Sequence, residues 1–186
     1  MRCLPLLALI PGLAAPPVAA AGPAPASKAL LKRGAYLVGI MGCHDCHTPL
    51  KMGPKGPEPD MSRMLSGHPE GMKMPPPPAL PPGPWGWAGS LTMTAFTGPW
   101  GVSYSANLTP DRATGLGDVG EQDFIQAMRT GRHLGKGRPI LPPMPFQGIG
   151  TATDADLKAI FAYFRSIPAI RNKVPEPVDP ADAPKP

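Results

Sequence analysis

The stretch Cys43-His44-Asp45-Cys46-His47 constrains this chain more than any other part of it. Two thiols three positions apart on one helical turn can add to the two vinyl groups of a single porphyrin. A histidine directly after the second cysteine is then held beneath the iron as an axial ligand. Such a Cys-x-x-Cys-His run is typical of c-type haem attachment. The spacing therefore predicts a haem c bound covalently through Cys43 and Cys46, with His47 coordinating its iron.

A Cys-x-x-Cys pair also occurs in redox dithiols and in zinc sites. The adjoining histidine argues against both alternatives, and zinc would need further close-set Cys or His ligands, which the sequence does not supply. The chain has three cysteines, and Cys3 lies in the leader, so the mature chain keeps no thiol for a disulfide. A second Cys-x-x-Cys-His run does not occur, which predicts one haem.

The composition is unusual for a small globular domain. Proline (30 residues) and glycine (22) alone would indicate low complexity, and aromatic residues make up only 6% of the chain. A covalently held macrocycle resolves this conflict, because it supplies a large apolar body for the centre of a small core. The formal net charge of +5 includes no long basic run, so it favours docking to an acidic partner over binding to nucleic acid.

Residues 1–21 have the pattern of a secretory signal peptide: Arg2, an apolar stretch at residues 4–18, and three final alanines. Prolines interrupt the apolar stretch, which is too short and broken for a transmembrane helix. The leader predicts secretion across the inner membrane and a periplasmic location. An uncleaved membrane anchor is the alternative.

Three helices are predicted. The first covers residues 28–41, with Ser27 as its N-cap and Gly34 marking a close crossing by another element. The second covers residues 121–130 and is stopped by a glycine. The third begins after its cap Thr153 and ends at a proline, and its apolar residues fall at i, i+3, i+4 and i+7.

The rest of the chain is organised around these helices. Residues 48–89 have almost no periodicity, hold most of the prolines, and predict a long loop over the haem edge in which His68 is exposed. The haem-binding domain is predicted to cover residues 28–174. A linker at residues 22–27 precedes it, and a disordered Pro-rich tail at residues 175–186 follows it.

Several segments in this order resemble the class I cytochrome c family. They are Arg-Gly-Ala-Tyr-Leu-Val at residues 33–38, the haem motif, Asn-Leu-Thr-Pro-Asp at 107–111, Pro-Pro-Met-Pro at 142–145, and the aromatic-rich helix at 156–165. The chain is most similar to the single-haem bacterial c-type cytochromes of the dehydrogenase-associated kind, over roughly residues 28–174.

The resemblance implies an all-α fold: a small cytochrome c-like helical domain around one covalent haem, with a long Pro/Met-rich loop inserted. It also implies that the first and last helices cross near Gly34, and that Met144 is the distal iron ligand opposite His47. The residues themselves agree, since prolines stiffen the chain on both sides of Met144 and a thioether is a soft, neutral ligand that raises the haem potential.

Other side chains compete for the distal position. His133 would give bis-histidine ligation and a lower potential, although it reads more simply as a surface residue in a basic loop. Met128 lies on a helix stripe, which favours a place in the core. Met93 and the methionines of the long loop lack rigid flanks.

With both axial positions filled, the iron would exchange an electron without binding a substrate. The sequence therefore predicts a carrier that cycles between Fe(III) and Fe(II), and not an enzyme. Its expected partners are a dehydrogenase donor and an oxidase or another cytochrome as acceptor, with membrane association through a partner or an uncleaved leader.

Two points stay open at this stage. The chain could be a haem-bearing subunit of a dehydrogenase or oxidase complex, or a peroxidase-like enzyme or sensor with an open distal site. Basic residues after the second helix could dock an acidic partner, bind the propionates, or form an ordinary solvated loop. They are Arg129, Arg132, Lys136 and Arg138.

Overall fold

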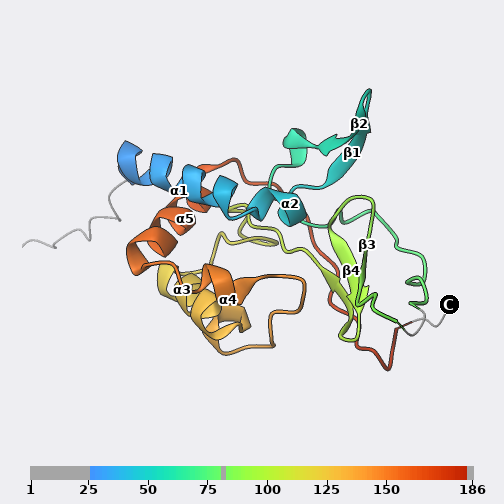
Figure 1. The fold of residues 1–186 in the computed structure, drawn as a ribbon. Helices are drawn as coiled ribbons and strands as arrows, with labels where there is room; N and C mark the ends of the chain where they lie inside the picture. The colour runs from blue at the N-terminus through green and yellow to red at the C-terminus, as the bar shows by residue number, and fades with distance from the viewer. Residues whose placement is uncertain (1–25, 81–82, 184–186) are drawn as a thin grey trace, which may run out of the picture.

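The computed structural model describes residues 26–80 and 83–183 (Figure 1). The signal peptide predicted at residues 1–21 lies outside the described residues. The described elements follow in the order α1 (Lys28–Ile40), α2 (Cys43–His47), β1 (Leu50–Gly53), β2 (Gly56–Pro59), η1 (Met61–Arg63), β3 (Ala88–Gly89), β4 (Ala95–Gly98), β5 (Gly101–Tyr104), α3 (Glu121–Thr130), η2 (His133–Gly135), α4 (Phe146–Ile149) and α5 (Asp154–Ser166).

Helices α1 and α5 lie side by side and cross at Gly34, as predicted (Figure 1). A Cβ atom at Gly34 would collide with the carbonyl oxygen of Ala159, so only glycine lets the two backbones approach this closely. Val38 and Leu157 are completely buried in the core that the two helices share with α3. This crossing is the main packing contact of the helical part.

The predicted helix boundaries are confirmed to within about a residue, because the capping residues act as expected. The Ser27 hydroxyl accepts a hydrogen bond from the Leu30 N–H (3.2 Å), and the Thr153 hydroxyl accepts one from the Asp156 N–H (3.1 Å). Helix α3 ends at Gly131, whose φ of 64° is the left-handed conformation of a helix C-cap. Among the helices of residues 26–80 and 83–183, none combines the length and apolar character that a membrane crossing requires.

The prediction of an all-α fold is wrong. Strands β1 and β2 form an antiparallel hairpin, and β3, β4 and β5 form a three-stranded antiparallel sheet, so the architecture is mixed α/β. The strands have only two to four residues and include glycine and proline, which leaves no alternation long enough to recognise in the sequence. Three of them, β1, β2 and β3, lie within the segment of residues 48–89 predicted to be a long loop. Strands β4 and β5 follow shortly after that segment.

The segment after Pro175, for which the sequence predicts disorder, lies along the edge of this sheet. Val178 and Val102 of β5 exchange both backbone hydrogen bonds, at 2.8 and 2.9 Å. Pro177 precedes Val178 and Pro180 follows it, so the segment offers few other N–H groups for pairing. A single residue pair therefore joins this segment to β5.

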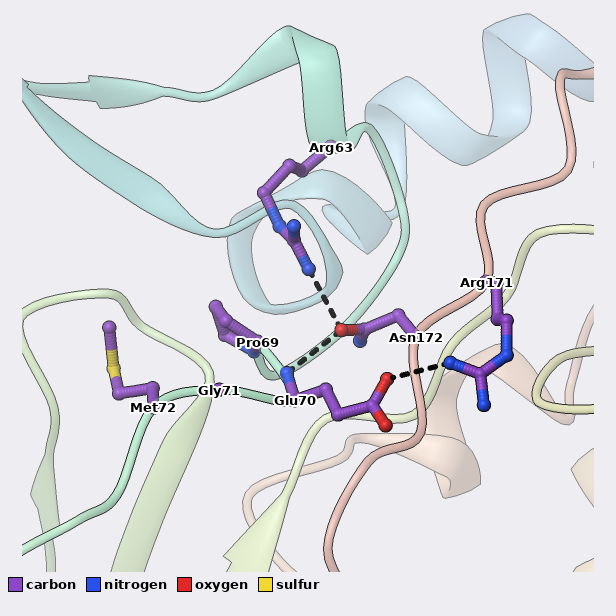
Figure 2. A pocket seen from close by; sticks show the side chains of 7 residues that line it. All are labelled: Arg63, Pro69, Glu70, Gly71, Met72, Arg171 and Asn172. Carbon is purple, nitrogen blue, oxygen red and sulfur yellow. Dashed lines mark hydrogen bonds and ion pairs between the residues drawn. The ribbon is translucent and has the colours of Figure 1, made fainter.

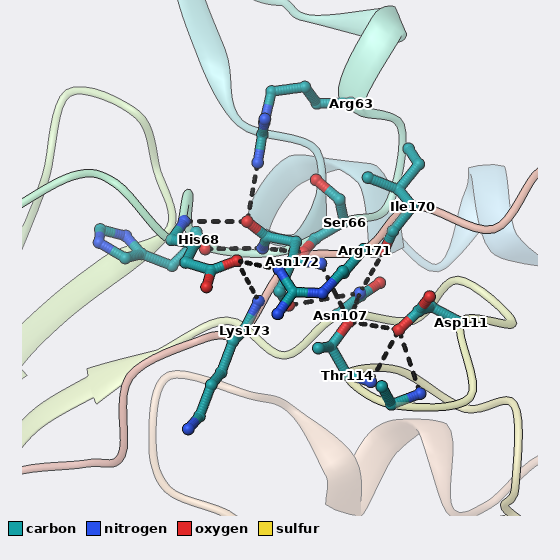
Figure 3. Close-up of polar contacts among 12 residues, drawn as sticks. Arg63, Ser66, His68, Asn107, Asp111, Thr114, Ile170, Arg171, Asn172 and Lys173 are labelled. Carbon is teal, nitrogen blue, oxygen red and sulfur yellow. Dashed lines mark hydrogen bonds and ion pairs between the residues drawn. The ribbon is translucent and has the colours of Figure 1, made fainter.

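One buried amide ties the long loop to the segment after α5 (Figure 3). The Asn172 side-chain oxygen accepts hydrogen bonds from the Arg63 guanidinium (2.8 Å) and the Glu70 N–H (2.9 Å). Its NH₂ group donates to the carbonyl oxygens of Ser66 (2.7 Å) and His68 (2.8 Å). The amide makes four hydrogen bonds, which is its full capacity, so this part of the long loop is fixed to the core.

The prediction that His68 is exposed is wrong. Its side chain is fully buried, its Nδ1 lies 3.0 Å from the Thr94 hydroxyl, and its ring packs 4.9 Å from the Tyr104 ring. Both partners belong to the sheet region, far along the chain. Because this burial depends on contacts between distant segments, the local sequence around His68 could not indicate it.

We expect His68 to make the protein acid-sensitive. Burial lowers the pKa of His68 below its ordinary value of about 6.5, so the unfolded state binds a proton before the folded state does. The stability contribution is complete above about pH 6.5 and is lost as the pH falls toward the lower folded-state pKa, at up to about 1.4 kcal/mol per pH unit. Urea unfolding of the holoprotein at several pH values should show this loss. His68→Gln should show a smaller one, whereas identical pH profiles would contradict the prediction.

Candidate haem site

The four predicted site residues line one cavity of about 270 Å³. Cys43, Cys46 and His47 reach it from α2, and Met144 reaches it from the loop before α4. Gly42 joins α1 to α2 in the left-handed conformation (φ 68°), which permits the sharp change of direction between the helices. The other lining side chains are mostly apolar and include Phe96, Leu108, Phe124, Ile160 and Phe164.

His47 is held in the state that a metal ligand needs. Its ring is buried, and Nδ1 lies 2.8 Å from the carbonyl oxygen of Ala106. A neutral imidazole that donates from Nδ1 keeps its lone pair on Nε2. Burial also lowers the pKa of His47, which favours the neutral form. Such a hydrogen bond from the second ring nitrogen is the usual way to orient a ligating histidine.

Asn107, the residue after Ala106, is held by several hydrogen bonds of its side chain (Figure 3). The Asn107 NH₂ group donates to the carbonyl oxygen of Ile170 (2.8 Å), and its side-chain oxygen accepts from the Thr109 N–H (3.0 Å). The sequence indicated only a turn at this Asn-Leu-Thr-Pro-Asp motif. Sequence reasoning therefore missed the role of Ala106, although the motif stands directly beside it.

The two cysteines are protonated thiols at neutral pH. Burial raises the pKa of Cys43 to about 11 and also raises the pKa of Cys46. Redox dithiols work through a thiolate of lowered pKa, so the raised values argue against that alternative. A zinc site is also unsupported, because the described residues contain no group of three His, Cys, Asp or Glu side chains arranged to hold a metal.

The loop that carries Met144 is fastened to the sheet. The Ser103 hydroxyl of β5 donates a hydrogen bond to the Pro142 carbonyl (2.7 Å), and the Trp100 indole donates to the Ser103 hydroxyl (3.2 Å). After Met144, its own carbonyl accepts from the Phe146 N–H (2.9 Å). The sheet that the sequence did not predict thus helps to position the predicted distal ligand.

The rivals of Met144 separate into two groups. His133 is exposed in η2 and does not line the cavity, whereas Met93 and Met128 do. Met93 has a φ of 55°, which is uncommon for a residue other than glycine, and its N–H donates to the Ser90 carbonyl (2.9 Å). A hydrogen-bonded turn thus places Met93 at the cavity, so Met93 stays a rival of Met144.

Two of the four basic residues predicted as a docking group, one at the end of α3 and one after it, are paired with carboxylates of the chain. Arg129 pairs with Asp154 (2.5 Å) and also donates to the Gly150 carbonyl. Arg138 lies 3.9 Å from Glu176. These carboxylates offset part of the positive charge that the sequence places in this region.

A second hollow, of about 430 Å³, lies between the long loop and the segment after α5 (Figure 2). Its charged groups mainly contact one another: the Arg171 guanidinium lies 3.5 Å from the Glu70 carboxylate, and Arg63 donates to Asn172. None of the predicted site residues lines it. The chemistry predicted from the sequence therefore belongs to the cavity around His47.

The donor set of that cavity fits a haem c: two neighbouring protonated thiols, an imidazole with Nε2 free, a thioether, and apolar walls.

No family model matches the chain. Curated relatives do. The gluconate 2-dehydrogenase cytochrome c subunit of Pantoea cypripedii is 33% identical over 139 residues, which are 75% of this chain and 23% of that protein. The alcohol dehydrogenase (quinone) cytochrome c subunit of Gluconobacter oxydans is 30% identical over 173 residues, 91% of this chain and 29% of that protein.

A third relative, the fructose dehydrogenase cytochrome subunit of Gluconobacter japonicus, is 33% identical over 92 residues, 50% of this chain and 17% of that protein. The chain thus spans less than a third of the length of the relatives it matches. All three are named as cytochrome subunits of dehydrogenases, which confirms the resemblance drawn from the sequence motifs. The chain belongs to the c-type cytochromes, and it is most similar in sequence to proteins named as cytochrome subunits of dehydrogenases.

Proposed function

We propose that this chain is an electron-transfer module that works with a dehydrogenase in the periplasm. It binds one haem c covalently through Cys43 and Cys46, with His47 and Met144 as the axial ligands. The observation that carries this proposal is the hydrogen bond from His47 Nδ1 to the Ala106 carbonyl, which leaves Nε2 available in the cavity that Met144 also lines. Bound haem would supply a one-electron Fe(III)/Fe(II) couple.

The residues of the chain account for carrier behaviour. With His47 and Met144 both bound to the iron, a substrate would find no free coordination position. Aromatic and aliphatic side chains around them exclude water, which favours the less charged, reduced state of the site. We therefore assign electron transfer, and no catalytic reaction, to this chain.

The proposed redox partners are inferred from the names of the relatives, which are cytochrome subunits of dehydrogenases. A dehydrogenase is the proposed electron donor, and an oxidase or another cytochrome is the proposed acceptor. The relatives differ in the substrates that their names state, and the chain spans only part of each, so no substrate is assigned. The leader pattern at residues 1–21 supports the periplasmic location.

Replacing both motif cysteines tests the proposal. The double variant Cys43→Ala/Cys46→Ala is expected to carry no covalent haem, because alanine cannot form a thioether. Haem staining of a denaturing gel, after expression with a c-type maturation system, measures the attachment. Cys3→Ala is the matched control and should stain like the unchanged protein. A stained band from the double variant, or high-spin iron that binds CO readily in the unchanged protein, would contradict the proposal.

A further inference from the structure

A long uncharged stretch lies next to the cavity. Between Lys73 and Asp111 the sequence has no Asp, Glu, Lys, Arg or His, although charged residues make up 17% of the whole chain. This stretch includes all three strands of the sheet β3–β4–β5. The strands of this sheet therefore carry no ionic groups of their own.

Residues 83–93, which we term the tryptophan arm, expose large apolar side chains from this stretch. Trp85 is 75% exposed and Leu91 is 90% exposed. Between them, Trp87 is 47% exposed and also lines the cavity, as does Met93 at the end of the arm. The arm thus reaches from the cavity wall to the molecular surface.

Contacts with the sheet hold residues 87–90 of the arm in place. Strand β3 pairs with β4, and the Trp87 ring meets the Phe96 ring edge-on at 5.9 Å. The Ser90 hydroxyl accepts a hydrogen bond from the Ala95 N–H (3.1 Å), which closes the turn that presents Leu91. Holding large apolar side chains in water on an ordered element is unfavourable, and such patches mark interaction sites.

Given the proposed electron-transfer function, on which this step rests, we infer that the tryptophan arm is the docking surface for the dehydrogenase. The occupant is an apolar, uncharged face of that protein. Buried interface centres are enriched in Trp and Met and depleted of charge, as the arm is. Electron transfer requires contact close to the cofactor, and Trp87 belongs to both the surface and the cavity wall.

The uncharged character also defines the kind of contact. Transient encounters depend on complementary charges that steer association, and these weaken with salt. The arm has none, and the basic residues Arg129 and Arg138 are paired with carboxylates of the same chain. The arm therefore makes a lasting subunit contact, held by apolar burial and insensitive to salt.

Photo-crosslinking in the native host identifies what covers the arm. Benzoyl-phenylalanine is placed at Trp85 or Leu91, and at Met52 of β1 as a control of equal exposure (75%). The expected result is an adduct with a dehydrogenase from the first two positions and not from Met52, identified by mass spectrometry. Adducts with phospholipid, with a second copy of this chain, or with no dehydrogenase at all would overturn the inference, as would an equal yield from Met52.

The dehydrogenase found in this way then serves as the binding partner in solution. Trp85→Ser/Leu91→Ser should weaken its binding at least about tenfold, because aromatic anchors dominate interface energy, whereas Met52→Ser should not. Haem reduction by the dehydrogenase and its substrate should change less than about twofold between roughly 20 and 500 mM NaCl. A tenfold fall with salt, or unchanged binding of the double variant, would overturn the inference.

The two proposals can fail separately. Dithionite reduction and the visible spectrum report the haem site without any partner, and none of the replaced residues lines the cavity. A normal spectrum with unimpaired binding of the arm variant overturns the docking surface alone. An abnormal spectrum of the unchanged holoprotein overturns the electron-transfer assignment itself.

Discussion

Replacing Met144 by alanine is expected to remove the weak charge-transfer band at the red edge of the oxidised spectrum, which reports a methionine–iron bond. The midpoint potential should fall by on the order of 0.1–0.3 V, part of the roughly 0.8 V range that axial ligands span. The variant should also bind CO, because alanine leaves the distal position open. Visible spectroscopy and a redox titration of the purified holoprotein measure all three effects.

The other methionines of the cavity provide the controls. Met93→Ala and Met128→Ala remove thioethers from the same cavity and should keep the charge-transfer band. Met52→Ala removes a thioether from the exposed β1–β2 hairpin and should keep the band as well. If Met144→Ala keeps the band and Met93→Ala loses it, the assignment of the distal ligand is wrong. Because Met93 sits in an ordered turn, this comparison is a stringent one.

The second large effect concerns stability. Gly34→Ala should lower the free energy of unfolding by about 3 kcal/mol or more, because the new methyl group would collide with the backbone of Ala159. A rotating side chain could yield to the methyl group, but a helix backbone yields only if α1 and α5 move apart. Guanidinium unfolding of the holoprotein, followed by circular dichroism, measures the loss.

Gly39 gives a matched control on the same helix. A Cβ atom there would meet nothing within 4 Å, so Gly39→Ala should raise stability by about 0.5–1 kcal/mol through its higher helix propensity. The same substitution should therefore have opposite signs at two positions of α1. Equal destabilisation at both would mean that helix α1, and not its crossing with α5, limits stability.

The sequence predicted the helical part of the fold because its determinants are local. Ser27 and Thr153 cap helices through bonds to residues three positions away, and apolar periodicity marks the buried faces. The strands could not be predicted in the same way. Residues such as Ala88 and Thr97 pair across a turn, and short strands of glycine, alanine and threonine have no distinctive pattern.

The residues of the candidate site also divide into those set by local sequence and those brought in from distant segments. The haem motif is contiguous, so Cys43, Cys46 and His47 could be predicted from spacing alone. Ala106 and Trp87 come to the site from distant segments and show no motif of their own. Ala106 acts through its backbone carbonyl, which every residue has, and only the fold shows that His47 is its partner. Met144 remains a predicted ligand, now with a described place in the cavity.

The pairing of Val178 with Val102 bears on aggregation. An exposed strand edge can recruit a strand from another molecule, and β5 is such an edge. The segment that covers it is rich in proline, so it occupies the edge with one residue pair and cannot extend the pairing outward. The chain thus blocks growth of its sheet from the β5 edge, and it does so with a sequence that has little capacity to form a strand itself.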